Sequence, residues 1–189
     1  VCTGEGASSY FARFKKVLKQ AVKDKIILQS PANDITIVRD ESLKKDVLTI
    51  QDIQKLANTE ITNQVIKKAF LFSCFTGLRW VDIKDLQWKH IDLESEVLNK
   101  VQAKTDVKVS VTLNTNALSL LPEKGEKNEF VFALPSHTGA LKILKLWLKK
   151  ADIDKHITWH CARHSFATNL IVYDTDVLIV SKLLGHNTL

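Results

Sequence analysis

The sequence has 189 residues, of which 45% are hydrophobic and 25% are charged, as is typical of a folded protein. Lys and Arg number 27 against 21 Asp and Glu, and the resulting net charge of +6 fits either a slightly basic surface or a nucleic-acid-binding protein. No apolar run approaches the ~18 residues of a membrane-spanning helix, and the first residues lack the pattern of a signal peptide, so we expect no membrane contact.

The cysteines at positions 2, 74 and 161 are too few and too scattered for a disulfide framework, and no C-x-x-C pair suggests structural zinc. We therefore expect a reducing, cytoplasmic location and neither a metal ion nor a cofactor. The chain begins at Val1 and contains no methionine, so we also expect it to be a piece of a longer protein.

Near the N-terminus, apolar residues recur at helical spacing and predict one amphipathic helix over residues 8–28. Such a helix cannot bury its apolar stripe alone and must dock elsewhere. The charged run in residues 34–47 is interpreted as a linker or an extended crossing. The sequence therefore predicts two parts, residues 1–35 and residues 36–189.

The first helix of the second part is marked by Thr49 and Asp52, whose spacing resembles a capping box. A longer apolar helix over residues 61–75 follows, and Gly77 is a natural left-handed terminator for it.

Arg79 lies just after this glycine, at the joint with a short helix over residues 81–86. A rigid joint can hold an arginine inward at a site. The alternative, which is at least as good on this motif alone, is a surface arginine that pairs with Asp82.

Residues 90–113 change period, because valines alternate there with polar residues, and we predict a small antiparallel sheet. Its main hairpin pairs residues 97–103 with residues 107–113, and Lys104 lies in the turn. A lysine at a hairpin tip is usually solvated, but it is also well placed to reach the backbone of a bound partner. Residues 130–135 are apolar and extended, either as another short strand or as a buried loop.

The remaining segments are predicted to be helical. Asn114 caps a helix to Leu121, and Ser136 caps one that runs to about Lys150. The last helix covers residues 175–184, ends at Gly185, and is expected to bury Val177, Val180 and Leu184. The predicted fold class is α+β, mainly α-helical with a small three-stranded antiparallel sheet.

Between these helices lies WHCARHSFATNL, a helix capped by Thr158 in which His160 and Arg163 are three residues apart and share one face. A guanidinium beside an imidazole suits a phosphate, whose oxygens accept two parallel hydrogen bonds. The competing interpretation is a metal site of His160, Cys161 and His164. Histidines at positions i and i+4 can share a zinc ion, but no third ligand at good spacing to that pair is evident.

Together these segments resemble the tyrosine recombinase, or phage integrase, family. TGLRWVDIKDL is similar to the first arginine box of the family, HCARHSFATNL to its H-x-x-R box and LLGH to its L-G-H box. QAKTDVKVSVTL resembles the β-hairpin whose lysine is catalytic in the family. The motifs occur in the order of the family and cover residues 48–189.

The resemblance implies metal-independent breaking and rejoining of a DNA phosphodiester. Arg79 and Arg163 would stabilise the charge on phosphate, and His160 and His186 would orient groups or assist proton transfer. Lys104 would be the general acid that protonates the leaving 5′ oxygen, although Lys100 and Lys108 lie close by. Asp82 would hold a neighbour such as Arg79.

The nucleophile of the family is a tyrosine several residues after the L-G-H box. This chain stops at Leu189, and its only tyrosines, Tyr10 and Tyr173, precede that box. The resemblance therefore implies that the nucleophile follows Leu189 and that the chain as given binds DNA without cleaving it.

On this interpretation residues 1–35 are the C-terminal helix of a helical core-binding domain, and residues 36–189 are a catalytic domain. The expected partners are double-stranded DNA and copies of the same chain, as a tetramer on paired sites, in the cytoplasm of a bacterium that carries a phage or another mobile element. A catalytically inactive DNA-binding module and a metal-dependent hydrolase remain as alternatives.

Overall fold

In the computed structural model of this chain, the structure describes residues 4–36 and 46–185. The chain falls into an N-terminal unit, residues 1–44, and a main unit, residues 45–189, and each is described by itself. None of the described helices is both long and apolar enough to span a membrane.

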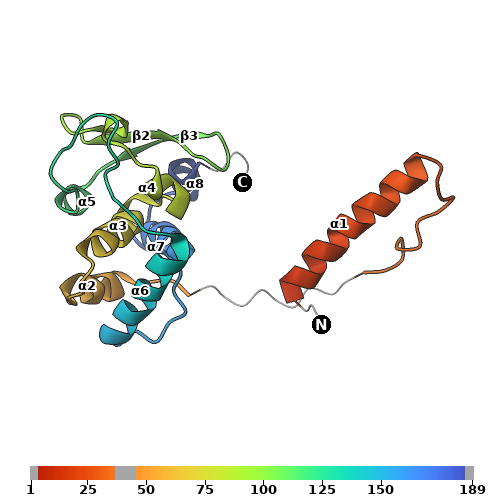
Figure 1. Ribbon diagram of the computed structural model, residues 1–189, viewed down its shortest axis with the longest axis horizontal. Helices are drawn as coiled ribbons and strands as arrows, with labels where there is room; N and C mark the ends of the chain where they lie inside the picture. The colour runs from red at the N-terminus through yellow and green to blue at the C-terminus, as the bar shows by residue number, and fades with distance from the viewer. Residues whose placement is uncertain (1–3, 37–45, 186–189) are drawn as a thin grey trace. The chain divides into compact units, whose positions relative to one another are not determined.

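The N-terminal unit is built on α1, Gly4–Lys23 (Figure 1). The prediction of a helix over residues 8–28 was correct in type, but this helix begins and ends earlier. Lys25 takes a φ of 59°, and the Ile26 N–H donates to the Ala21 carbonyl over 2.9 Å. The left-handed conformation of Lys25 ends the helix, because the residues that follow it no longer continue the helical path.

The main unit begins with α2, Ile50–Asn58, and α3, Gln64–Thr76. The capping box of Thr49 and Asp52 is confirmed, with both hydrogen bonds present. Helix α3 begins later than predicted because Asn63 caps it by accepting from the backbone N–H of Ile66. Gly77 ends it with a φ of 68°, as expected, and the short α4, Trp80–Lys84, follows.

The predicted sheet is present and antiparallel, in the order β1-β2-β3. Its strands are β1, Ile91–Asp92, β2, Val97–Val101, and β3, Lys108–Thr112, with a short 3₁₀ helix η1, Trp88–His90, before β1. The register pairs Val97 with Thr112 and Val101 with Lys108, and the tip is closed by a hydrogen bond from Asp106 N to Gln102 O. Residues 130–135 add only an isolated bridge between Gln87 and Phe130, so a fourth strand does not form there.

The rest of the main unit is helical: α5, Thr115–Ser119, α6, His137–Lys150, α7, Trp159–Val172, and α8, Val177–Leu184. The predicted caps Asn114 and Ser136 are confirmed. The fold class is therefore confirmed as mainly α-helical with one three-stranded antiparallel sheet.

The core of the main unit forms where α7 packs against α3 (Figure 1). The ring of Phe70 meets Trp159 edge-on at 5.3 Å between centroids and Trp147 at 6.0 Å. Both tryptophans are almost completely buried, so this aromatic cluster fixes α7 in place.

The prediction that Val177 is buried was wrong, because its side chain is 55% exposed. Asp176 caps α8 by accepting from the Leu178 N–H, so Val177 is the first residue of the helix and points to its open side. Val180 and Leu184, one and two turns later, are buried as expected.

Gly77 is required by both its backbone and its neighbours. A Cβ there would lie 2.6 Å from Phe166 Cδ1, in addition to the strain of a positive φ. We expect Gly77→Ala to lower the free energy of unfolding by about 2–4 kcal/mol in urea denaturation. The control is Gly139→Ala in the first turn of α6, where stability should change by less than about 1 kcal/mol. Equal stabilities of the two variants would contradict this account.

Candidate functional site

Helix α7 is clamped to the start of the main unit as well as to the core. The Leu48 N–H donates to Ser165 Oγ over 2.7 Å, and Asn169 Nδ2 donates to the Leu48 carbonyl over 3.1 Å. Ser165 Oγ donates in turn to the Cys161 carbonyl within the helix. These contacts give the residues of α7 fixed positions, which a site built on that helix requires.

Arg163 extends from α7 into the protein interior and is only 4% exposed. Its Nη1 donates to the Gly77 carbonyl over 2.8 Å, and its Nη2 donates to the Leu184 carbonyl. Gly77 ends α3 and Leu184 ends α8, so the guanidinium binds the carboxyl ends of two helices. Carbonyl groups at helix ends carry partial negative charge and suit a buried cation.

The surroundings of Arg163 lower its pKa. Burial, followed by the nearby charge of Arg79, lowers the pKa of Arg163 to about 10, while Asp82 acts in the opposite direction. The side chain still carries its proton at neutral pH. An anion between the two guanidinium groups would relieve the part of this lowering that comes from Arg79.

Arg79 is half-buried at the start of α4, and its Nη1 donates to Oε1 of Gln102. Gln102 is completely buried, and its Nε2 donates to the Leu184 carbonyl over 3.1 Å. This is the same carbonyl that accepts from Arg163. The structure therefore brings the two predicted arginines together through the hairpin and the end of α8.

Asp82 is completely buried in α4, and its Oδ1 accepts the Ala103 N–H over 2.9 Å. The ion pairs among the described residues include none between Asp82 and Arg79, so the expectation that Asp82 holds Arg79 was wrong. The carboxylate instead fixes the backbone of Ala103, at the start of the hairpin turn. Its Oδ2 has no hydrogen-bond partner among the described residues.

Lys104 is exposed in the hairpin turn, as predicted, between Ala103 and Thr105, each of which bonds a buried side chain near the arginines. Ala103 is bonded to Asp82, and Thr105 Oγ1 donates to Gln102 Oε1 over 3.1 Å.

The two lysines that compete with Lys104 differ from it in position. Lys100 is 8% exposed, and its Nζ donates to the Asp85 carbonyl over 3.2 Å. Lys108 begins β3 at the foot of the turn. Of the three lysines, only Lys104 combines an exposed amine with a place in the turn.

His160 and Arg163, which were expected to share one face of α7, differ in exposure, because His160 is exposed and Arg163 is buried. The His160 ring packs edge-on against His164, with 4.5 Å between centroids. Cys161 faces the interior, 3.3 Å from the Thr158 hydroxyl. No group of three His, Cys, Asp or Glu side chains with metal-site geometry occurs within residues 4–36 and 46–185. The remaining predicted site residue, His186, lies outside the described residues.

Tyr173 caps the far end of α7 and is exposed. It follows Arg163 by ten residues, which is about 15 Å along a helix axis. Tyr173 is therefore poorly placed to reach a group bound by Arg163.

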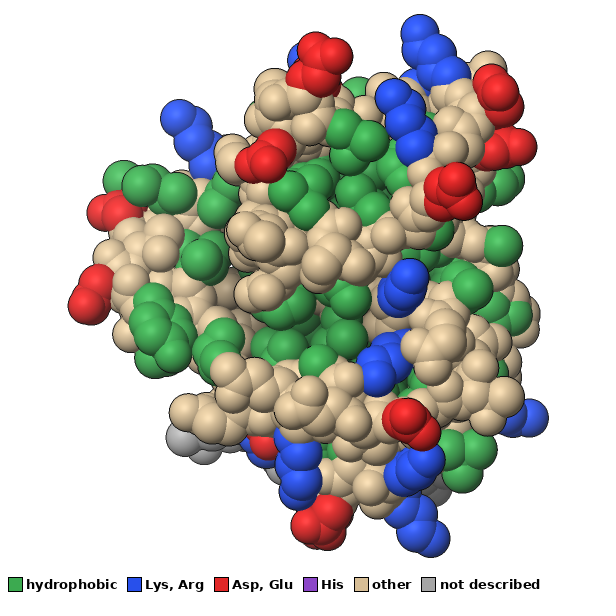
Figure 2. Space-filling view, turned by 90° about the vertical axis from the view of Figure 1, so that its left-hand side faces the viewer, with side chains coloured by type: hydrophobic (Ala, Val, Ile, Leu, Met, Phe, Trp, Pro, Cys, Tyr) green, Lys and Arg blue, Asp and Glu red, His purple; other side chains and the backbone are tan. Residues whose placement is uncertain are grey.

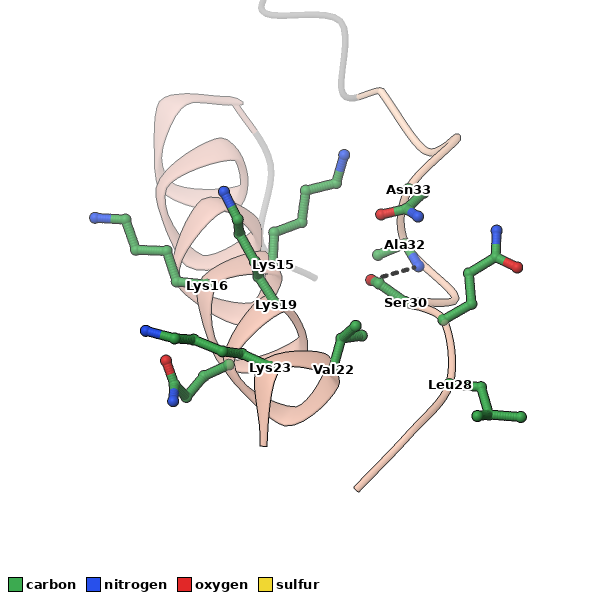
Figure 3. A pocket seen from close by; sticks show the side chains of 11 residues that line it. Lys15, Lys16, Lys19, Val22, Lys23, Leu28, Ser30, Ala32 and Asn33 are labelled. Carbon is green, nitrogen blue, oxygen red and sulfur yellow. Dashed lines mark hydrogen bonds between the residues drawn. The ribbon is translucent and has the colours of Figure 1, made fainter. Parts of the chain in front are cut away.

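Basic side chains are distributed unevenly. In the N-terminal unit, Lys15, Lys16, Lys19 and Lys23 follow one side of α1 and border an open pocket of about 870 Å³, which is also lined by residues 28–30, 32 and 33 (Figure 3). On the face drawn in Figure 2, Lys and Arg side chains are interspersed with Asp and Glu around an apolar hollow. That face does not offer a uniformly basic surface to a polyanion.

The sequence interpretation missed Gln102, Ser165 and Asn169, whose side chains tie the site together. For Gln102 a signal was present. Leu98, Lys100 and Gln102 occupy alternate positions along the first half of the hairpin and are all buried, and this period of two is the signal that could have indicated a polar residue on the buried face beside the turn. Nothing local marks Ser165 or Asn169, because their partner Leu48 is more than 100 residues away.

The sequence of this chain is similar to those of known recombinases. The sequence model of the phage integrase family matches residues 44–189. The tyrosine recombinase XerD of Listeria innocua is 28% identical over 198 residues, covering 94% of this chain and 66% of that protein. XerC of Escherichia coli O157:H7 is 27% identical over 205 residues, covering 98% and 68%. The chain spans about two thirds of the length of the curated relatives that it matches.

Solved structures with the same fold include the Tn1549 transposon integrase in complex with transposon right end DNA. It has a TM-score of 0.83 at 18% identity, covering 98% of this chain and 73% of that one. XerA recombinase has a TM-score of 0.66 at 20% identity, covering 92% and 65%. With the family match extending over the whole main unit, these findings show that this chain belongs to the phage integrase family.

Proposed function

We propose that this chain is the DNA-cleaving part of a site-specific recombinase, which breaks and rejoins a phosphodiester through a covalent 3′-phosphotyrosine without a metal ion. The observation that carries the proposal is the pair Arg79 and Arg163. Gln102 accepts from Arg79 and donates to the Leu184 carbonyl, which also accepts from Arg163, so the structure holds two cations near each other although their charges repel. Placing two cations together costs free energy, and an attacked phosphate, with its growing negative charge, is a partner that offsets that cost.

The roles follow from the order of bond changes. A tyrosine oxygen attacks phosphorus and loses its proton with the assistance of His160, and the bond between phosphorus and the 5′ oxygen breaks. Arg79 and Arg163 donate to the non-bridging oxygens, whose charge increases in the transition state. Lys104 gives its proton to the leaving 5′ oxygen, a role supported by its exposed position in a turn that is tied to the arginines.

His160 is assigned to orienting the phosphate or assisting proton transfer at the exposed rim of α7, and His186 has the same assignment from the sequence alone. The nucleophile is proposed to be a tyrosine that follows Leu189. The distance of Tyr173 from Arg163 along α7 supports this choice.

The proposed partner is double-stranded DNA, bound by a tetramer on paired sites in the bacterial cytoplasm. The names of similar proteins support this setting, since they include XerC and XerD recombinases and a transposon integrase solved with transposon DNA. An origin in a phage or another mobile element fits the same comparisons. The N-terminal unit is proposed to be the end of a core-binding domain, with the lysines of α1 near DNA phosphates.

The test uses the gene product extended past Leu189 and a nicked duplex that carries its native site. We expect a protein–DNA adduct that survives denaturing electrophoresis, forms in EDTA and maps to a tyrosine. The control is Arg13→Ala, at an exposed position of α1, and this variant should still form the adduct. DNA binding without any adduct would support the inactive DNA-binding module instead, and an adduct that requires a divalent metal would contradict the proposed chemistry.

A further inference from the structure

The buried amide of Gln102 joins three segments that carry the proposed chemistry. Its Oε1 accepts from Arg79 Nη1 and from Thr105 Oγ1, the latter over 3.1 Å. Its Nε2 donates to the Leu184 carbonyl over 3.1 Å. One side chain thus contacts the first arginine, the turn that carries Lys104 and the end of α8.

These contacts form part of a closed ring of hydrogen bonds. From Arg79 the ring passes through Gln102 to the Leu184 carbonyl, which also accepts from Arg163. Arg163 then donates to the Gly77 carbonyl, which lies two residues before Arg79 in the chain. The relative position of the two guanidinium groups therefore depends on the Gln102 amide.

We infer that Gln102 is a positioning residue for strand cleavage, which sets both the Arg79 guanidinium and the Lys104 turn relative to Arg163. The inference rests on the proposed function, because it assumes the roles given above to Arg79, Lys104 and Arg163. It concerns a residue that need not touch the DNA.

The chemistry of the site requires an amide at this position. A primary amide offers an acceptor to Arg79 and a donor to the Leu184 carbonyl at the end of one side chain. A carboxylate has no donor for that carbonyl, and it would pair with Arg79 in competition with phosphate. A leucine of similar size offers neither group.

The backbone at the end of α8 makes room for this amide. Gly185 has a φ of 67°, and a Cβ there would lie 3.1 Å from Gln102 Oε1 and 2.8 Å from Val109 Cγ1. A side chain at this position would press on the amide from the side of α8. The glycine thus serves the hydrogen-bond ring as well as the end of the helix.

The experiment measures single-turnover cleavage by the complete gene product at saturating DNA, with Gln102→Glu, Gln102→Leu and the control Asn99→Asp. Asn99 lies on the same strand with an exposed side chain, so Asn99→Asp adds the same charge outside the ring. We expect both Gln102 variants to cleave about 10²-fold more slowly, because small displacements of reacting groups cost rates of that order. Asn99→Asp should cleave at the wild-type rate.

A second substrate separates positioning from a loss of folded protein. DNA with sulfur in place of the bridging 5′ oxygen has a leaving group that needs no proton donor. Gln102→Leu should recover about tenfold on this DNA relative to wild type, because the displaced Lys104 is then not required. A residual deficit should remain, since Arg79 is still displaced.

The possible outcomes distinguish a failure of the inference about Gln102 from a failure of the proposed function. If both Gln102 variants cleave within about threefold of wild type while Arg79→Ala is inactive, the inference is wrong and the proposed function stands. If Gln102→Leu loses the same factor on both substrates, Gln102 does not set the Lys104 turn and the inference also fails. If Arg79→Ala itself cleaves normally, the proposed function fails.

Discussion

Replacement of Arg163 by lysine is expected to lower the rate of strand cleavage by about 10²–10³-fold, the range typical for loss of one preorganised donor to a developing oxyanion. Lysine keeps the charge, but it cannot donate to the Gly77 and Leu184 carbonyls and still present a second edge to phosphate. The measurement is single-turnover cleavage at saturating DNA. Affinity for DNA should fall much less, because the total charge is unchanged.

A matched control is Arg13→Lys, the same chemical change at an exposed position of α1, which should cleave at the wild-type rate. Urea denaturation tests the structural part of the effect separately. Arg163→Ala leaves two buried carbonyls without their charged donor and should lose about 2–3 kcal/mol of stability, whereas Arg163→Lys should lose less. Full activity of Arg163→Lys would show that a positive charge alone suffices and that the several hydrogen-bond donors of the guanidinium group are not needed.

Features whose cause is local could be predicted from the sequence. The capping box of Thr49 and Asp52 and the left-handed turn at Gly77 each depend on a few neighbouring residues, and all appear in the structure. The hairpin was predicted with its turn at Lys104, because alternation and a polar turn are also short-range signals. Boundaries were less certain, as the early end of α1 at Lys23 shows.

What the sequence could not supply is the set of long-range partners. Gln102 contacts Arg79 across 23 residues and Leu184 across 82, and no periodic pattern encodes such pairs. The expectation that Asp82 holds Arg79 failed for the same reason, since closeness in sequence favoured a neighbour while the fold brought Ala103 to the carboxylate. The motifs predicted which residues gather at the site, but not which hydrogen bonds hold them.

The placement of Arg163 also bears on how the site is assembled. Its guanidinium bonds the carbonyl of Gly77, just after α3, and the last carbonyl of α8, so the site forms only when both helices have docked on α7. The Leu184 carbonyl is one residue from Gly185, after which the chain continues to the motif histidine at position 186. A change at the end of α8 would therefore reach Arg163 and Gln102 directly.

Removal of the Lys104 amine is expected to slow cleavage of ordinary DNA by about 10²–10⁴-fold, the usual contribution of a general acid. The reason is that the 5′ oxygen is a poor leaving group unless it receives a proton as its bond to phosphorus breaks. Lys104→Ala should therefore recover to within about tenfold of wild type on DNA with sulfur at the bridging 5′ position. Single-turnover cleavage of the two substrates at saturating DNA provides the measurement.

Lys108 offers a matched control, because it is an exposed lysine at the foot of the same turn. Lys108→Ala removes one positive charge, as Lys104→Ala does, so both variants should weaken DNA binding to a similar, modest degree. Only Lys104→Ala should show the oxygen-to-sulfur recovery. If Lys108→Ala or Lys100→Ala showed it instead, the proton donor would be reassigned to that residue. Equal losses on both substrates for Lys104→Ala would mean that its amine binds phosphate rather than donating a proton.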